Sequence, residues 1–155
     1  WGSFLWQMFE SCTWSRREGD RDGINDKGLM TYDRQRKKDT YFFYKANWNP
    51  EPMVYITSRR DVRRGQALTP LRVYSNASLV ELKVNGKSIG ARKTNDIRIA
   101  EWQDVNLATG KNTIEVSAKW GSKVVTDSCE WEYVPGLKEV HPAPGDKDGK
   151  PVIGK

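Results

Sequence analysis

Polar and apolar residues alternate along much of the chain between residues 53 and 134. Val80, Leu82 and Val84, for example, are separated by charged residues, and an Asn-Gly pair, a strong signal for a tight hairpin, follows them. Strands predicted in this way cover about residues 53–57, 70–75, 79–85, 88–92, 98–107, 112–120 and 123–134. About seven short strands with turn residues between them predict a mainly β protein, an immunoglobulin-like β-sandwich.

The start of the chain follows a different pattern. Trp1–Phe9 is an almost continuous apolar run, which is typical of a strand buried on both faces in a parallel sheet. Such a strand needs neighbours that this sequence does not contain. Residues 10–31 are polar and punctuated by glycines, and they predict a long loop.

A helix is predicted after this loop. Asp33 is its expected N-cap, and the basic residues that follow are expected to form its solvated first turns. Tyr41, Tyr44 and Trp48 fall on one helical face, which Phe42 and Phe43 widen. Pro50 and Pro52 end the helix at about Asn47–Trp48. We expect this aromatic face to pack either on the first strand or on the sandwich.

The composition changes again near the end of the chain, where Pro, Gly, Lys and Asp dominate. This composition is typical of a linker or tail. The patterns therefore divide the chain into residues 1–50, 51–135 and 136–155.

The net charge of +6 does not alter this picture, because the basic residues are spread along the chain rather than gathered in a patch. We therefore expect no nucleic-acid partner. No apolar run approaches the length that spans a membrane, so no membrane partner is expected. Cys12 and Cys129 match no metal-binding spacing and His141 is the single histidine, so neither a metal nor another cofactor is predicted. Buried free thiols are favoured over a disulfide between the two cysteines.

Several blocks of the first fifty residues resemble the end of the catalytic barrel of glycoside hydrolase family 2, the family of β-galactosidase and β-glucuronidase. The matching blocks are Gly2-Ser3-Phe4-Leu5-Trp6, Gly23-Ile24-Asn25-Asp26-Lys27-Gly28-Leu29, Tyr32-Asp33-Arg34 and the run from Lys37 to Trp48. Two weaker signatures, Val84-Asn85-Gly86-Lys87 and Gly110-Lys111-Asn112, resemble the sandwich that follows the barrel in many such enzymes. The resemblance implies a C-terminal fragment: the last strand, loop and helix of a TIM barrel, then the sandwich, then a linker.

The family hydrolyses glycosides with retention, through an acid/base glutamate and a nucleophilic glutamate roughly 5 Å apart. The resemblance places both upstream of Trp1, so we expect no catalytic residue in this chain and no activity from the chain alone. Its own loop carboxylates are expected to form solvated ion pairs with neighbouring arginines instead. These carboxylates are Glu10, Glu18, Asp20 and Asp22.

What the resemblance leaves in this chain is a wall of the sugar pocket. It places Trp6 near the C-terminal end of the last barrel strand, where barrel enzymes carry their active sites, and a Trp there is expected to stack on the sugar. Burial in the barrel core is the alternative for Trp6. The Asn-x-Lys spacing of Asn25 and Lys27 resembles the motif with which β-glucuronidases bind the substrate carboxylate. The alternative for Lys27 is an ordinary loop cation.

The Asn-Asp-Lys-Gly-Leu sequence around this spacing also occurs in relatives similar to β-galactosidases. We therefore predict a parent enzyme that hydrolyses terminal β-galactosides, with a β-glucuronidase as the alternative. The expected partners are the carbohydrate substrate and the rest of the parent chain. By resemblance, the parent is expected to be a periplasmic or secreted bacterial enzyme.

Two roles are open for the sandwich: a structural brace or an independent carbohydrate-binding module. A flat Trp ring suits the face of a pyranose, and the sandwich contains three such residues. Trp120 and Trp131 fall on the apolar side of their strands, which favours burial, whereas Trp102 lacks a convincing inward pattern. The structural role is therefore the favoured prediction.

Overall fold

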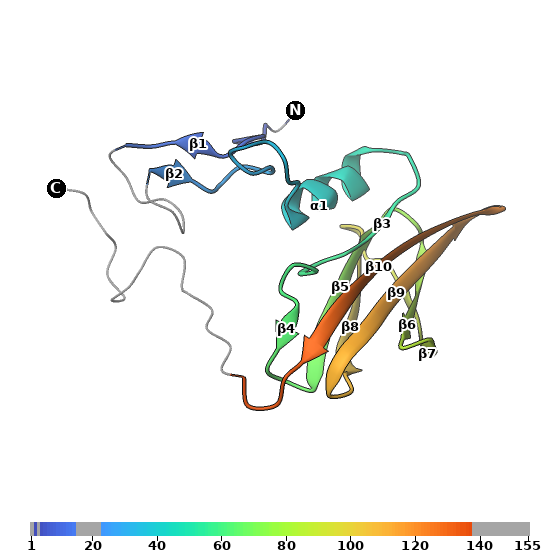
Figure 1. Cartoon of the computed structure of the whole chain (residues 1–155). Coiled ribbons are helices and arrows are strands. Elements are labelled where there is room, and N and C mark those ends of the chain that lie inside the picture. Colours follow the sequence, from blue (N-terminus) through green and yellow to red (C-terminus); the bar gives the residue numbers. More distant parts are fainter. Residues whose placement is uncertain (1, 3, 15–22, 138–155) are drawn as a thin grey trace. The chain divides into compact units, whose positions relative to one another are not determined.

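The computed structural model describes residues 2, 4–14 and 23–137. The chain divides into two compact units, Trp1–Tyr41 with Val140–Lys155, and Phe42–Glu139 (Figure 1). Most of the predicted tail, including His141, lies outside the described residues. The domain boundaries predicted at residues 50 and 135 remain predictions.

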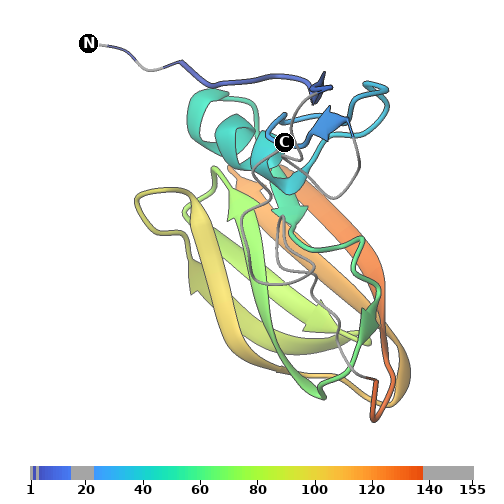
Figure 2. The ribbon, with the colours of Figure 1, turned by 90° about the vertical axis from the view of Figure 1, so that its left-hand side faces the viewer.

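The second unit is a β-sandwich, as predicted, and its two sheets face one another in Figures 1 and 2. Five strands form one sheet in the order β4 (Arg63–Arg64), β10 (Lys123–Tyr133), β9 (Gly110–Trp120), β6 (Leu79–Val84) and β7 (Lys87–Lys93). Three strands form the other in the order β3 (Val54–Ile56), β5 (Leu68–Ser75) and β8 (Ile99–Asn106). Each of the seven predicted strands is present, and β4 is the addition.

The core of the sandwich follows from the alternation of its strands. Along β6 and β9 every second side chain is buried, including Leu82, Ile114 and Val116. Burying an aliphatic side chain contributes about 1.5–3 kcal/mol through removal of its apolar surface from water. Trp131 lies in this core with 1 % of its surface exposed, and Trp120 is partly buried against it.

Trp102 is buried as well, at 3 % exposure, although its inward direction was not predicted from the sequence. The pairing of β5 with β8 has an irregularity: Thr69 pairs with Val105, whereas Leu71 pairs with Trp102. The extra residue on β8 shifts its inward positions by one, so that Trp102 and Val105 both face the core. A simple period-two pattern cannot register such a bulge, which is why the inward direction of Trp102 was missed.

The two weaker sequence signatures of the sandwich meet in space. Asn85 and Gly86 both have positive φ, 52° and 75°, as the tight turn between β6 and β7 requires. The Asn85 amide donates to the Asn112 Oδ1 atom at 2.9 Å. Asn112 is 1 % exposed and also bonds the backbone of Ala108 and Gly110. These asparagines therefore have a structural role, since a buried amide must satisfy its hydrogen bonds.

The helix α1 (Asp39–Trp48) ends where predicted but begins six residues after Asp33. Asp33 Oδ1 instead accepts the Gln35 N–H at 3.0 Å, in a turn that also contains Arg34 at a φ of 62°. The predicted N-cap was therefore wrong, because the Asp33 side chain stabilises a local turn rather than the helix.

The helix α1 packs on the sandwich, one of the two predicted partners, but through the residues that were expected only to widen its aromatic face. Phe42 stacks on Tyr55 of β3, with ring centroids 3.7 Å apart, and Phe43 meets Tyr74 edge to face at 5.5 Å. Ala46 between them is buried, whereas Trp48 is 61 % exposed. The helix therefore contacts the sheet through Phe42 and Phe43, with Ala46 in the same cluster, while Trp48 of the predicted stripe stays exposed.

The N-terminal unit contains two short paired strands, β1 (Ser11–Cys12) and β2 (Ile24–Asn25). The strand expected at the start of the chain is not formed by the described residues of that segment. Phe4, Trp6 and Met8 are exposed there, by 101 %, 81 % and 48 %. A strand buried on both faces requires partner strands, and none pairs with the described part of this segment apart from one bridge at Phe9.

Candidate functional site

The Asn25–Lys27 spacing lies where β2 ends and the chain reverses direction. Ser11 pairs antiparallel with Asn25, but after the turn Phe9 makes a parallel bridge to Met30. Within the turn, Asn25 Oδ1 accepts the Lys27 N–H at 2.9 Å. Asn25 is 6 % exposed, whereas the Lys27 side chain reaches solvent. The amide oxygen, which would repel an anion, is therefore turned into the loop backbone.

Gly28 fixes the far side of the same turn. A Cβ atom at this position would lie 2.1 Å from the backbone N of Glu10 and 2.2 Å from the carbonyl carbon of Phe9. No other residue fits without moving backbone, because real Cβ atoms do not approach so closely. The next two residues are hydrogen-bonded as well, Leu29 N–H to Gln7 O at 3.0 Å and Met30 N–H to Met8 O at 2.9 Å.

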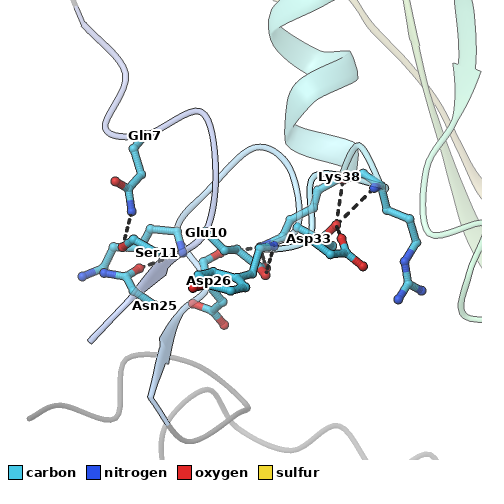
Figure 3. Close-up of polar contacts among 11 residues, drawn as sticks. Gln7, Glu10, Ser11, Asn25, Asp26, Asp33 and Lys38 are labelled. Carbon is cyan, nitrogen blue, oxygen red and sulfur yellow. Dashed lines mark hydrogen bonds and ion pairs between the residues drawn. The ribbon is translucent and has the colours of Figure 1, made fainter. Parts of the chain in front are cut away.

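Buried Glu10 and partly buried Lys38 form an ion pair next to this turn (Figure 3). Lys38 Nζ lies 2.6 Å from Glu10 Oε1, and their side chains are 22 % and 3 % exposed. Glu10 Oε2 accepts the Tyr32 N–H at 2.9 Å, and Lys38 Nζ also donates to the Asp26 carbonyl. This corrects two predictions: Glu10 is not a solvated loop carboxylate, and Lys38 is not part of a solvated helix start.

Trp6 precedes the segment that pairs with the turn. Gln7 bonds Leu29 through its carbonyl and Ser11 through its side chain, at 3.0 and 2.7 Å. The peptide bond between Trp6 and Gln7 is cis. The Trp6 ring is exposed, in contrast to the three tryptophans of the sandwich strands. The structure thus carries Trp6 and Lys27 on two segments joined by backbone hydrogen bonds, a local arrangement that brings the predicted site residues into one unit.

Other chemistry is sparse in the described part of the chain. No group of three or more His, Cys, Asp or Glu residues that could hold a metal ion is found there, and no helix described is long and apolar enough to cross a membrane. Neither Cys12 nor Cys129 forms a disulfide. Glu18, Asp20 and Asp22, with the arginines expected to pair with them, lie outside the described residues.

Sequence reasoning missed three members of this site: Glu10, Gly28 and Lys38. Glu10 ends an apolar run and Lys38 belongs to a basic run, and neither pattern indicates a contact across 28 residues. Gly28 carried a usable signal, because a glycine directly after the Asn-x-Lys spacing is consistent with a close backbone approach.

Comparisons with known proteins find glycoside hydrolases among the relatives of this chain. Residues 66–126 match a family model described as a domain of unknown function, DUF4982. A β-glucuronidase of Bacteroides fragilis is 44 % identical over 134 residues, a match that covers 86 % of this chain and 19 % of that protein. A β-galactosidase of Bacteroides ovatus is 33 % identical over 91 residues, or 58 % of this chain and 10 % of that protein.

Solved structures agree. The crystal structure of an FMN-binding β-glucuronidase from Faecalibacterium prausnitzii matches with a TM-score of 0.75 and 38 % identity, over 83 % of this chain and 19 % of that one. The predicted resemblance is therefore confirmed: the relatives of this chain are β-glucuronidases and β-galactosidases of glycoside hydrolase family 2. The chain spans about a fifth of the length of the β-glucuronidase relative named above.

Proposed function

We propose that this chain is part of a retaining β-glycosidase that hydrolyses terminal β-glucuronides. In that enzyme it supplies one wall of the sugar pocket and a supporting sandwich. The observation that carries the proposal is the turn in which the buried Asn25 side chain holds the backbone of the exposed residue Lys27. The B. fragilis β-glucuronidase matches more of this chain, at higher identity, than the β-galactosidase does. The comparisons thus favour the uronidase alternative over the galactosidase preferred from the sequence.

The chemistry of the turn suits a uronic acid. A charge-assisted hydrogen bond from Lys27 to the C6 carboxylate would contribute about 1.5–3 kcal/mol, and galactose offers no anion for it. The exposed Trp6 ring would stack on the apolar face of the same sugar. Retaining hydrolysis also needs two carboxyl groups about 5 Å apart, and the proposal assigns both to the rest of the enzyme. The chain alone is accordingly proposed to be inactive.

For the sandwich we propose a bracing role rather than independent sugar binding. A sugar platform needs an exposed aromatic ring, but Trp102 and Trp131 are buried and Trp120 packs partly buried against the core. The proposed partners are the carbohydrate substrate and the rest of the parent chain.

The test uses the full-length enzyme that carries this chain, with aryl β-D-glucuronide and aryl β-D-galactoside as substrates. The unmodified enzyme is expected to prefer the glucuronide, and Lys27→Ala to lower kcat/KM for it by roughly ten- to a hundredfold, the loss of one charge-assisted contact. Lys119→Ala on β9 removes another exposed lysine and is the matched control, expected to leave kcat/KM for both substrates unchanged. A preference for galactoside, or full glucuronide turnover by Lys27→Ala, would overturn the proposal.

A further inference from the structure

We infer that the partly buried Glu10–Lys38 ion pair is a positioning device for Lys27, and through it a determinant of specificity for a substrate carboxylate. This inference rests on the proposed function and deepens it. Neither residue is placed against the substrate; both are argued to act through the backbone of the turn that carries Lys27.

The Glu10–Lys38 ion pair is costly to bury unless its charges are paired and hydrogen-bonded. The Glu10 carboxylate is 3 % exposed. Both carboxylate oxygens are engaged, Oε1 by Lys38 Nζ at 2.6 Å and Oε2 by the Tyr32 N–H at 2.9 Å. The pair is thus held in one geometry, in contrast to a mobile surface ion pair.

The ion pair is also linked to the turn. Lys38 Nζ donates to the backbone carbonyl of Asp26, the residue between Asn25 and Lys27 (Figure 3). The ammonium therefore ties the middle of the turn to Glu10, on the segment that follows Trp6. The Lys38 ammonium is shared by the Glu10 carboxylate and the Asp26 carbonyl. Removing the charge of Lys38 or of Glu10 should therefore shift the Asp26 carbonyl.

Consecutive residues of the turn are anchored in different ways. The Asn25 side chain bonds the Lys27 N–H, Lys38 bonds Asp26, and Gly28 packs against the Phe9–Glu10 backbone. The Lys27 backbone is thus fixed on both sides, and its exposed side chain starts from a defined point. Such pre-organisation matters because a shift of about 1 Å in a binding group can cost roughly a hundredfold in rate.

The experiment is a double-mutant cycle in the full-length enzyme, with two aryl substrates that differ only at C6: a β-D-glucuronide and a β-D-glucoside. Lys38→Met and Glu10→Gln are each expected to lower kcat/KM for the glucuronide by roughly ten- to a hundredfold. Turnover of the glucoside should change by less than about twofold, because no carboxylate depends on Lys27 there. Glu10→Gln keeps an acceptor for the Tyr32 N–H, so it tests the charge if Lys38→Met does not fold.

The cycle separates positioning from mere structural support. In the Lys27→Ala variant, adding Lys38→Met should lower kcat/KM for the glucuronide by less than about a further twofold. The reason is that the turn that Lys38 positions no longer carries the Lys27 ammonium. Lys38→Arg keeps a cation beside Glu10 and should lower kcat/KM for the glucuronide less than Lys38→Met does. The neighbouring Lys37→Met, which removes an exposed cation, is the matched control and should change neither substrate.

Equal losses on both substrates, or a full additional loss in the Lys27→Ala background, would overturn the inference while leaving the proposed function intact. If Lys27→Ala itself has no effect on the glucuronide, the proposed function fails and the inference fails with it.

Discussion

The two units of this chain are stabilised in different ways. The sandwich buries an apolar core of its own, in which Ile56, Val73 and Leu82 are wholly inaccessible to solvent. Among the described residues of the N-terminal unit, the polar Glu10 and Asn25 are buried together with Leu29, while Phe4 and Trp6 are exposed. The sandwich is therefore organised by the hydrophobic effect, whereas specific polar contacts hold the turn in the described part of the N-terminal unit. Specific polar contacts of this kind suit a binding site, because they fix direction as well as position.

The strongest contrast is between two tryptophans. Trp131→Ala should lower the free energy of unfolding of the sandwich by about 3–5 kcal/mol, because a buried indole is replaced by a cavity. Trp6→Ala is the matched change in the N-terminal unit and should alter stability by less than about 0.5 kcal/mol, since the ring is exposed. Urea titrations followed by far-ultraviolet circular dichroism measure both. Similar losses for the two variants would mean that Trp6 is a core residue.

The face of α1 offers a smaller contrast. Phe42→Ala removes the ring stacked on Tyr55 and should cost about 1–3 kcal/mol, from lost burial and lost ring contact. Trp48→Ala, at an exposed position on the same helix, should cost less than about 0.5 kcal/mol. The same urea titration applies. The opposite order would restore the aromatic face predicted from the sequence.

The two cysteines give the smallest effect. Burial raises the pKa of the Cys129 thiol from 9.0 to about 11, against the opposing effect of Arg59 and with a further increase from Asp127. Cys129 should therefore react with iodoacetamide at pH 8 far more slowly than the exposed Cys12. Mass spectrometry of the labelled peptides over time measures this. Equal labelling rates in the folded chain would show that Cys129 is accessible.

The raised pKa also predicts how stability depends on pH. The pKa of the Cys129 thiol is higher in the folded state than in the unfolded state. Its contribution to the free energy of unfolding is therefore complete below pH 9 and is lost as the pH rises toward 11. A Cys129→Ala variant should show a shallower decline of unfolding free energy over this interval. Identical pH profiles would contradict the assignment.

The difference between the units also explains what could be predicted from the sequence. The sandwich strands were predictable because period-two alternation and turn residues are local signals; Val80, Leu82 and Val84 followed by Asn85-Gly86 carry both. Trp102 was misjudged because a bulge on β8 interrupts the alternation. β4 was missed because Arg63–Arg64 has no apolar pattern and forms only by pairing with β10, where Arg64 lies 4.1 Å over the Trp131 ring.

The candidate site was only partly predictable. Asn25 and Lys27 lie within one short stretch of sequence, so the motif could be recognised through its resemblance to a family. The ion pair between Glu10 and Lys38 joins residues far apart in the sequence, and only the fold of the turn brings them together. Polar contacts between residues far apart in the sequence produce no periodic pattern from which they could be predicted.

The most direct test of the account is a crystal structure of the full-length enzyme with D-glucuronate bound. In that structure, Lys27 Nζ is expected to lie about 3 Å from a C6 carboxylate oxygen, at the distance of a charge-assisted hydrogen bond. The Trp6 ring is expected to face the sugar, and Lys38 to stay bonded to Glu10 and Asp26. A C6 carboxylate held by cations elsewhere, with Lys27 directed into solvent, would contradict the central claim.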